Sequence, residues 1–244
     1  MRRIILFLLL FLYSAAVSAE NHTVRVLLYH DVTGSGWDPG NPYAVPLSSF
    51  REQMAWLKEN GYRCLTVSGM FDAFAEGKLS ENLAVITFDD GYPGVYMSAF
   101  PVMSEYGFPG TEYIVAEKIG MPKNLSAEMI REMYGAGWEI GSHGMTHSAL
   151  TDHIDLDTEI CGSRRLIASL TGIPLQDISS FAYPYGSADE TVMNKVWKCG
   201  YLSGGGLGQI PVDSGQNHYY FSRHPVTSDM TIGQFAGLFA PEYE

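Results

Sequence analysis

The strongest constraint on the fold is a regular alternation of short β-rich runs with amphipathic helical stretches from residue 23 onward. Such alternation is typical of βα units, whose strands lie parallel in one sheet because each helix carries the chain back across it. About seven units follow one another, with no Pro/Ser-rich linker and no short fixed repeat. We therefore expect one α/β domain with a distorted (β/α)7-type barrel.

The alternation also predicts where the individual elements lie. The expected strands are residues 24–29, 62–67, 83–88, 111–116, 138–141, 178–183 and 219–221. The expected helices are residues 47–60, 70–75, 95–106, 127–136, 156–170, 188–199 and 232–239. Pro101 predicts a kink or a late helix start, and Ser126 is the expected N-cap of its helix. The glycines at 204–206 and 208 predict a flexible turn region.

The first nineteen residues have the pattern of a secretory signal peptide. Arg2 and Arg3 precede an apolar run at 4–13, and small residues follow as far as Ala19. A membrane anchor is the alternative, but the apolar run is about half as long as a spanning helix. We expect residues 1–19 to be removed and residues 20–244 to form a secreted or periplasmic domain without a membrane span.

The net charge limits the partners that the chain can bind. Lys and Arg total 15 against 27 Asp and Glu, which gives a net charge of −12. Nucleic acid is excluded as a partner because its phosphates need clustered positive charge, whereas a neutral or cationic glycan is compatible. In an oxidising compartment Cys64, Cys161 and Cys199 allow one disulfide, with three possible pairings. The sequence indicates no oligomeric state.

Polar residues stand at the ends of four expected strands. They are His30-Asp31, Asp89-Asp90-Gly91, Ser142-His143 and Pro184-Tyr185-Gly186. Because the carboxyl ends of parallel barrel strands gather at one face, we expect these residues to converge on one metal-sized site.

Two pairs of residues are candidates for metal chemistry. His143 and His147 have the spacing that places two imidazoles on one side of a helical turn, although a solvated helix start has the same spacing. Asp89 and Asp90 follow an apolar strand, where two carboxylates repel unless a cation or an Arg offsets them. Adjacent side chains point in different directions, so one carboxylate can bind a metal while the other acts as a base. An Asp-Gly turn at Asp90 is the alternative.

Three motifs resemble those of the polysaccharide deacetylase (NodB-like) family, also called carbohydrate esterase family four. They are ITFDDGY at 86–92, SHGMTH at 142–147 and FAYPYG at 181–186, in the family's order, and the similarity covers residues 24–226. The segment LYHDV at 28–32 is similar to the subgroup that acts on poly-N-acetylglucosamine. The resemblance implies a hydrolase that removes acetyl groups from an acetylated polysaccharide or oligosaccharide.

The resemblance also implies a role for each motif residue. Asp89 is the expected catalytic base, and Asp90, His143 and His147 are the expected metal ligands. This donor set suits Zn²⁺ and also accepts Co²⁺, Ni²⁺ or Fe²⁺. Metal-activated water would attack the acetamide carbonyl, with Asp89 taking its proton. The backbone N–H of Tyr185 would stabilise the resulting oxyanion.

The chain departs from the family pattern in two places. Ala182 occupies the position where the third motif usually carries an Arg that orients the catalytic Asp. Arg223 is the candidate replacement, although a solvated surface Arg is the alternative. His224 is the candidate general acid, but the Leu-x-His and Asp-x-x-Trp patterns that accompany this His in the family are absent. His30 is therefore a second candidate for the general acid. The alternatives are that His30 lines the sugar site or is a buried His at the end of a strand.

Aromatic residues near the motifs are candidates for sugar binding, because the apolar faces of sugars stack on aromatic rings. Trp37, Tyr92 and Tyr183 are the expected substrate contacts, whereas Trp138 is expected in the core. The leading hypothesis is an exported N-deacetylase of a poly-N-acetylglucosamine-like polymer. The alternatives are an O-acetyl esterase of the same fold acting on xylan, another amidohydrolase, and a non-catalytic sugar-binding relative.

Overall fold

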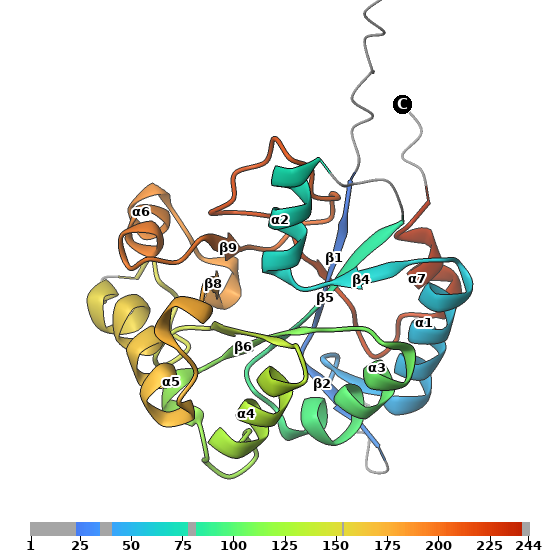
Figure 1. Ribbon diagram of the computed structural model, residues 1–244, viewed down its shortest axis with the longest axis horizontal. Coiled ribbons are helices and arrows are strands. Elements are labelled where there is room, and N and C mark those ends of the chain that lie inside the picture. The colour runs from blue at the N-terminus through green and yellow to red at the C-terminus, as the bar shows by residue number, and fades with distance from the viewer. Residues whose placement is uncertain (1–22, 35–40, 78–81, 153, 241–244) are drawn as a thin grey trace, which may run out of the picture.

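The computed structural model describes residues 23–34, 41–77, 82–152 and 154–240 (Figure 1). The expected signal peptide at 1–19 and Trp37 lie outside these residues. None of the helices in the described part of the chain is long and apolar enough to cross a membrane.

The core of the fold is a parallel sheet of eight strands that curls into a half-barrel, which confirms the expected α/β class (Figure 1). Its order is β10-β1-β5-β6-β7-β8-β9, and β4 pairs with the first half of β5. The strands are β1 (Arg25–Tyr29), β4 (Arg63–Leu65), β5 (Leu83–Asp89), β6 (Thr111–Ile114), β7 (Glu139–Ser142), β8 (Ser180–Ala182), β9 (Ser203–Gly205) and β10 (His224–Pro225). Two short strands, β2 (Asp31–Thr33) and β3 (Ala44–Pro46), form a separate parallel pair.

Helices surround the curled sheet (Figure 1). They are α1 (Leu47–Glu59), α2 (Val67–Glu76), α3 (Phe100–Tyr106), α4 (Ala127–Gly135), α5 (Ser163–Thr171), α6 (Glu190–Lys198) and α7 (Ile232–Gly237). The π turns η1 (Val95–Ala99) and η3 (Asp157–Gly162) precede α3 and α5, and single 3-10 turns are η2 (Ala116–Lys118), η4 (Leu175–Asp177) and η5 (Pro184–Gly186). The helix pairs α1 with α7, α1 with α3 and α4 with α5 are in contact.

Local sequence signals fix several helix ends as expected. Ser126 caps α4, because its Oγ accepts a hydrogen bond from the Met129 N–H at 3.2 Å. The expected helix 95–106 is divided at Phe100, with Pro101 in the first turn of α3, where no backbone N–H is required. Helix α2 begins earlier than expected because Thr66 caps it at the Gly69 N–H.

The strand β5 is the centre of the hydrophobic core, since all seven of its residues are buried. Phe88 of this strand stacks on Trp138, whose ring lies edge-on to Phe100. Trp138 is buried, as expected. Gly110 allows the close approach of this ring, because a Cβ there would lie 2.7 Å from the Trp138 side chain.

The glycine-rich segment 204–206 was expected to be a flexible turn, and this prediction is wrong. Its first two residues belong to β9, which pairs with β8. A Cβ on Gly205 would lie 2.8 Å from Nε of Arg223, and Cβ atoms on Gly204 and Gly206 would overlap Tyr183 and Tyr220. The glycines therefore allow side chains to pass close to the strand. The expected strand at 219–221 is reduced to one bridge between Phe221 and Gly205.

One disulfide connects Cys161 in η3 with Cys199 at the end of α6, with a Cα–Cα distance of 5.0 Å. Of the three pairings that the sequence allows, the structure has this one. Cys64 is free and buried, and burial raises the pKa of its thiol to about 12.

We expect the Cys161→Ala/Cys199→Ala double variant to lose about 2–4 kcal/mol of unfolding free energy, because the bridge restricts the unfolded chain. The bridged residues are separated by 38 positions in the sequence. Urea denaturation followed by circular dichroism measures the loss. Dithiothreitol should destabilise the wild-type protein to the same extent and leave the double variant unchanged. A double variant as stable as the wild type would contradict this prediction.

Candidate active site

A cavity of about 330 Å³ lies where the carboxyl ends of the strands meet. The expected site residues that line it are His30, Asp89, Asp90, Tyr92, His143, His147, Tyr183, Tyr185 and Arg223. Asn41, Tyr43, Leu207 and Thr227 also line it and were not expected from the sequence. His224 is not among the lining residues. The strand ends thus bring residues that are distant in sequence to one cavity.

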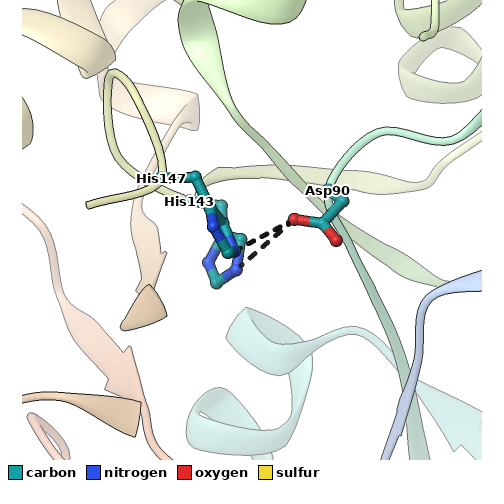
Figure 2. A group of neighbouring side chains, drawn as sticks. All are labelled: Asp90, His143 and His147. Atoms are coloured by element: carbon teal, nitrogen blue, oxygen red, sulfur yellow. Dashed lines mark ion pairs between the residues drawn. The ribbon is translucent and has the colours of Figure 1, made fainter. Parts of the chain in front are cut away.

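Asp90, His143 and His147 form a compact group, with one ligand atom from each residue lying within 4.8 Å of the others. Figure 2 shows both imidazoles facing the Asp90 carboxylate. The distances from Oδ1 of Asp90 are 3.2 Å to Nε2 of His147 and 3.9 Å to Nε2 of His143. The other ring nitrogens have their own partners, since Nδ1 of His143 lies 2.8 Å from the Ala182 carbonyl and Nδ1 of His147 lies 3.1 Å from Oη of Tyr185. The Nε2 atoms are thereby directed at one point.

This group fits a divalent cation. Burial lowers the pKa of His143 and of His147, despite the nearby carboxylates, so both imidazoles are neutral near pH 7. Oδ1 of Asp90 is buried and has no hydrogen-bond partner within the described residues. A buried carboxylate oxygen without a donor is costly unless a cation balances it. Two imidazole nitrogens and one carboxylate oxygen are ligands that Zn²⁺ and similar metals prefer.

The two histidines do not lie on a helical turn, and this part of the sequence interpretation is wrong. Residues 143–147 form a loop after β7, in which Gly144 has φ of 83° and His147 has φ of 72°. The imidazoles meet because the loop reverses direction, whereas a helix would have needed negative φ at both positions. The i, i+4 spacing therefore identified the correct pair for an incorrect reason.

Asp89 and Arg223 form a buried ion pair beside this group. Nη1 and Nη2 of Arg223 donate to the two carboxylate oxygens of Asp89 at 2.7 and 2.9 Å, so the expected contact is present. Burial raises the pKa of Asp89, but the charge and hydrogen bonds of Arg223, together with the nearby His143, outweigh burial and lower it to about 2. Arg223 also donates to the Gly206 carbonyl and lies over the ring of Tyr113. Asp89 is therefore held ionised in a fixed orientation.

Left-handed backbone conformations are concentrated at the cavity. Asp90, His147 and Tyr185 have φ values of 77°, 72° and 59°. Within the described part of the chain, Lys123 is the only other non-glycine residue with positive φ. Such conformations cost free energy and are retained where the surroundings and function require them.

Glu112 is a buried residue near the site that the sequence interpretation missed. It lies on β6, and its Oε1 accepts a hydrogen bond from the Gly91 N–H at 3.1 Å, immediately after Asp90. Burial and the charges of Asp89 and Asp90 raise its pKa well above the ordinary value. Its signal in the sequence is a carboxylate inside the short strand TEYI, which a fully buried strand seldom contains.

The two candidate general acids lie in different places. His30 lines the cavity, and its ring centroid lies 4.5 Å from that of Tyr43. His224 is on β10, is half-buried outside the cavity lining, and has a pKa lowered by burial and by Arg25. The cavity thus contains one of the two histidines.

Comparisons with known proteins found a family model, curated relatives and solved structures that are similar to this chain. The family model described as Polysaccharide deacetylase matches residues 76–203. YxkH of Bacillus subtilis strain 168, which carries the name of a polysaccharide deacetylase, is 30% identical over 214 residues, covering 86% of this chain and 74% of the relative. The poly-β-1,6-N-acetyl-D-glucosamine N-deacetylase of Staphylococcus aureus strain MRSA252 is 26% identical over 77% of this chain and 69% of its own. The crystal structure of a polysaccharide deacetylase from Bacillus cereus superposes with a TM-score of 0.78 at 26% identity, over 90% of this chain and 70% of that one.

We expect Arg223→Met to lower the free energy of unfolding at pH 7 by about 3–5 kcal/mol, because Asp89 would remain buried without its partner. In the wild type the folded pKa of Asp89 lies below the unfolded value of 3.8. Its stabilising contribution is therefore complete above the unfolded pKa and is lost as pH falls through the folded pKa. In the variant, the charge and hydrogen bonds of Arg223 no longer offset burial, which raises the pKa of Asp89, so acidification relieves the cost. Urea denaturation in EDTA at several pH values should show the difference between the two proteins shrinking as pH falls.

Arg51→Met is the matched control, because Arg51 makes the same two-pronged contact with Glu105, at 2.8 and 3.1 Å, on the exposed surface. We expect this variant to unfold as the wild type does, since exposed ion pairs contribute little. Equal losses in the two variants, or a loss in Arg223→Met that does not depend on pH, would contradict the role of the buried pair.

Proposed function

Because the chain belongs to the polysaccharide deacetylase family, we propose that it removes N-acetyl groups from a polymer of the poly-N-acetylglucosamine type. One observation carries the proposal: an ionised, oriented Asp89 lies beside a three-residue group suited to a divalent cation. The name of the Staphylococcus aureus relative supports the choice of polymer. Removal of residues 1–19 would release the enzyme into the periplasm or the medium.

Asp90, His143 and His147 would hold the cation, with Zn²⁺ first and Co²⁺, Ni²⁺ or Fe²⁺ as alternatives. When bound, such a cation supplies Lewis-acid polarisation and makes water acidic near neutral pH. The Ala182 carbonyl accepts from Nδ1 of His143, so Nε2 of His143 is the nitrogen that would face the cation, and the hydrogen bond between Nδ1 of His147 and Oη of Tyr185 orients the second ring.

Asp89 would act as the general base. Its carboxylate lines the cavity, and Arg223 keeps it ionised and prevents it from rotating. Oδ2 of Asp89 lies 3.6 Å from Nε2 of His143, so the base and the ligand group face the same space. A water molecule in this space could lose its proton to Asp89 while it attacks the acetamide carbon.

Tyr185 and His30 would complete the reaction. Tyr185 has a left-handed conformation and directly follows Pro184, whose ring fixes its own φ. We assign the backbone N–H of Tyr185 to stabilisation of the developing oxyanion. The leaving amine needs a proton, and His30 is the histidine of the two candidates that lines the cavity. Acetate and a free amine on the sugar are the products.

The rim of the cavity would bind the sugar. Tyr185 is 66% exposed and Tyr43 is 48% exposed, so both offer ring faces at the entrance. Tyr92 is a further lining residue. Tyr183 is almost fully buried, and its hydroxyl donates to the Tyr219 carbonyl at 2.6 Å, so we assign it to the wall of the cavity.

We expect the purified protein to release acetate from β-1,6-linked N-acetylglucosamine oligomers and to leave one free amine for each acetate. Chelation should abolish the activity and Zn²⁺ should restore it. Asp89→Asn should lower turnover by about 10²–10⁴-fold, because general-base catalysis contributes that much. Chromatographic measurement of acetate and fluorescent labelling of amines provide the test. Acetate from acetylated xylan alone would indicate an esterase, and sugar binding without any acetate release would indicate a non-catalytic relative.

We expect His30→Ala to lower turnover by about 10²–10⁴-fold with the bound metal retained, since a general acid contributes on this scale. His224→Ala should keep turnover near that of the wild type, because His224 lies outside the cavity lining. Steady-state kinetics together with metal analysis of both variants separates the two. The reverse pattern would assign the acid to His224.

A further inference from the structure

Glu159 is a buried carboxylate in the turn η3 that holds the loop between the two histidines. Its Oε2 accepts hydrogen bonds from the N–H groups of Met145 and Thr146 at 3.0 and 3.1 Å. Its Oε1 accepts from Oγ1 of Thr146 at 2.7 Å. Glu159 is only 6% exposed. All three donors belong to the residues between His143 and His147.

The opposite side of the same loop is held by the turn η2. The carbonyl of Gly144 accepts from the Ala116 N–H at 3.0 Å, and the carbonyl of Met145 accepts from the Glu117 N–H at 3.1 Å. The loop carbonyls are therefore bound by η2 and the loop N–H groups by Glu159. Since Oε2 of Glu159 accepts from both Met145 N–H and Thr146 N–H, removal of Glu159 would leave two backbone N–H groups without this partner.

These hydrogen bonds restrain the backbone conformation of the loop next to His147. His147 has φ of 72°, which an L-residue adopts only when its surroundings enforce it. The N–H of Thr146, directly before His147, is one of the two groups that Glu159 binds. Loss of this restraint would allow His147 to relax toward negative φ and would move its imidazole away from Asp90.

We infer that Glu159 is a positioning residue that sets the affinity of the site for a divalent cation through the loop 143–147. It acts on the backbone of the loop, whereas the hydrogen bonds to Nδ1 of the histidines orient their rings. The inference rests on the proposed metal site and adds a residue that the family motifs in this chain do not contain. It assigns a function to a buried charge that would otherwise be a cost to the fold.

The test is the Zn²⁺ affinity of Glu159 variants, measured with metal alone in competition with a chromophoric chelator. We expect Glu159→Ala to bind Zn²⁺ about 10–100-fold more weakly than the wild type, as is usual when a partner that orients the ligands is lost. We expect Glu159→Gln to recover most of the affinity, because an amide oxygen can accept both N–H groups and the amide nitrogen can donate to the Thr146 hydroxyl. If Glu159→Ala does not fold, Glu159→Asp takes its place, since the shorter carboxylate reaches the loop less well and should weaken binding.

Glu139→Ala is the matched control. Glu139 is a buried carboxylate that also accepts from one backbone N–H, that of Ser68 at 2.7 Å, and from one hydroxyl, that of Ser180. It lies at the start of β7, so its loss should lower the melting temperature and leave the Zn²⁺ dissociation constant unchanged.

A folded Glu159→Ala variant, or Glu159→Asp in its place, with the dissociation constant of the wild type would overturn the inference, as would equal weakening in Glu139→Ala. Absence of Zn²⁺ binding by the wild type would overturn both this inference and the metal site of the proposed function. Tight Zn²⁺ binding by the wild type that depends on Glu159, without acetate release from any glycan, would leave the inference standing and remove the proposed activity.

Discussion

The buried ion pair between Arg223 and Asp89 is the interaction on which the rest of the site depends. Asp89 ends the central strand β5, and Arg223 directly precedes β10, which pairs with β1. The backbone N–H of Gly208 also donates to the Arg223 carbonyl, so the last part of the chain lies between β9 and β1. Curling of the sheet and ionisation of Asp89 are therefore linked, because the same segment that brings the sheet edges together supplies the positive charge that stabilises the Asp89 carboxylate.

Small residues make room for this arginine. Ala182 of β8 pairs with Gly205 of β9, and a Cβ on Gly205 would collide with the Arg223 side chain. By the family resemblance, an arginine is expected at the position of Ala182. In this chain Arg223, from another segment, binds the Asp89 carboxylate. Of the glycine-rich run, Gly205 is the residue that makes room for this arginine.

The sequence predicted most of the fold and the members of the site, but not how they are held. A strongly apolar run in β5, the Ser126 cap and polar strand ends are local signals, and each predicted the correct element or cluster. The loop at 143–147 and the strand β9 were misjudged because contacts from distant residues decide their conformation. Glu159 binds the N–H of the residue before His147, and Tyr185 forms a hydrogen bond with the His147 imidazole. The side chain of Tyr183 lies close to the backbone of Gly204. Such contacts leave no periodicity in the sequence.

Backbone strain and the hydrogen bonds that oppose its relaxation together explain why the site has one conformation. Asp90, His147 and Tyr185 each adopt positive φ, at a cost of about 1–3 kcal/mol per residue. Hydrogen bonds of the adjacent residues oppose relaxation of these conformations. The N–H of Gly91, which follows Asp90, donates to Glu112, and the N–H of Thr146, which precedes His147, donates to Glu159. Because these acceptors are carboxylates buried in the fold, the free energy that holds the site comes from the folding of the whole domain. A cation entering such a site binds to ligands that are already directed at one point, and little of its binding free energy is used to rearrange the loops.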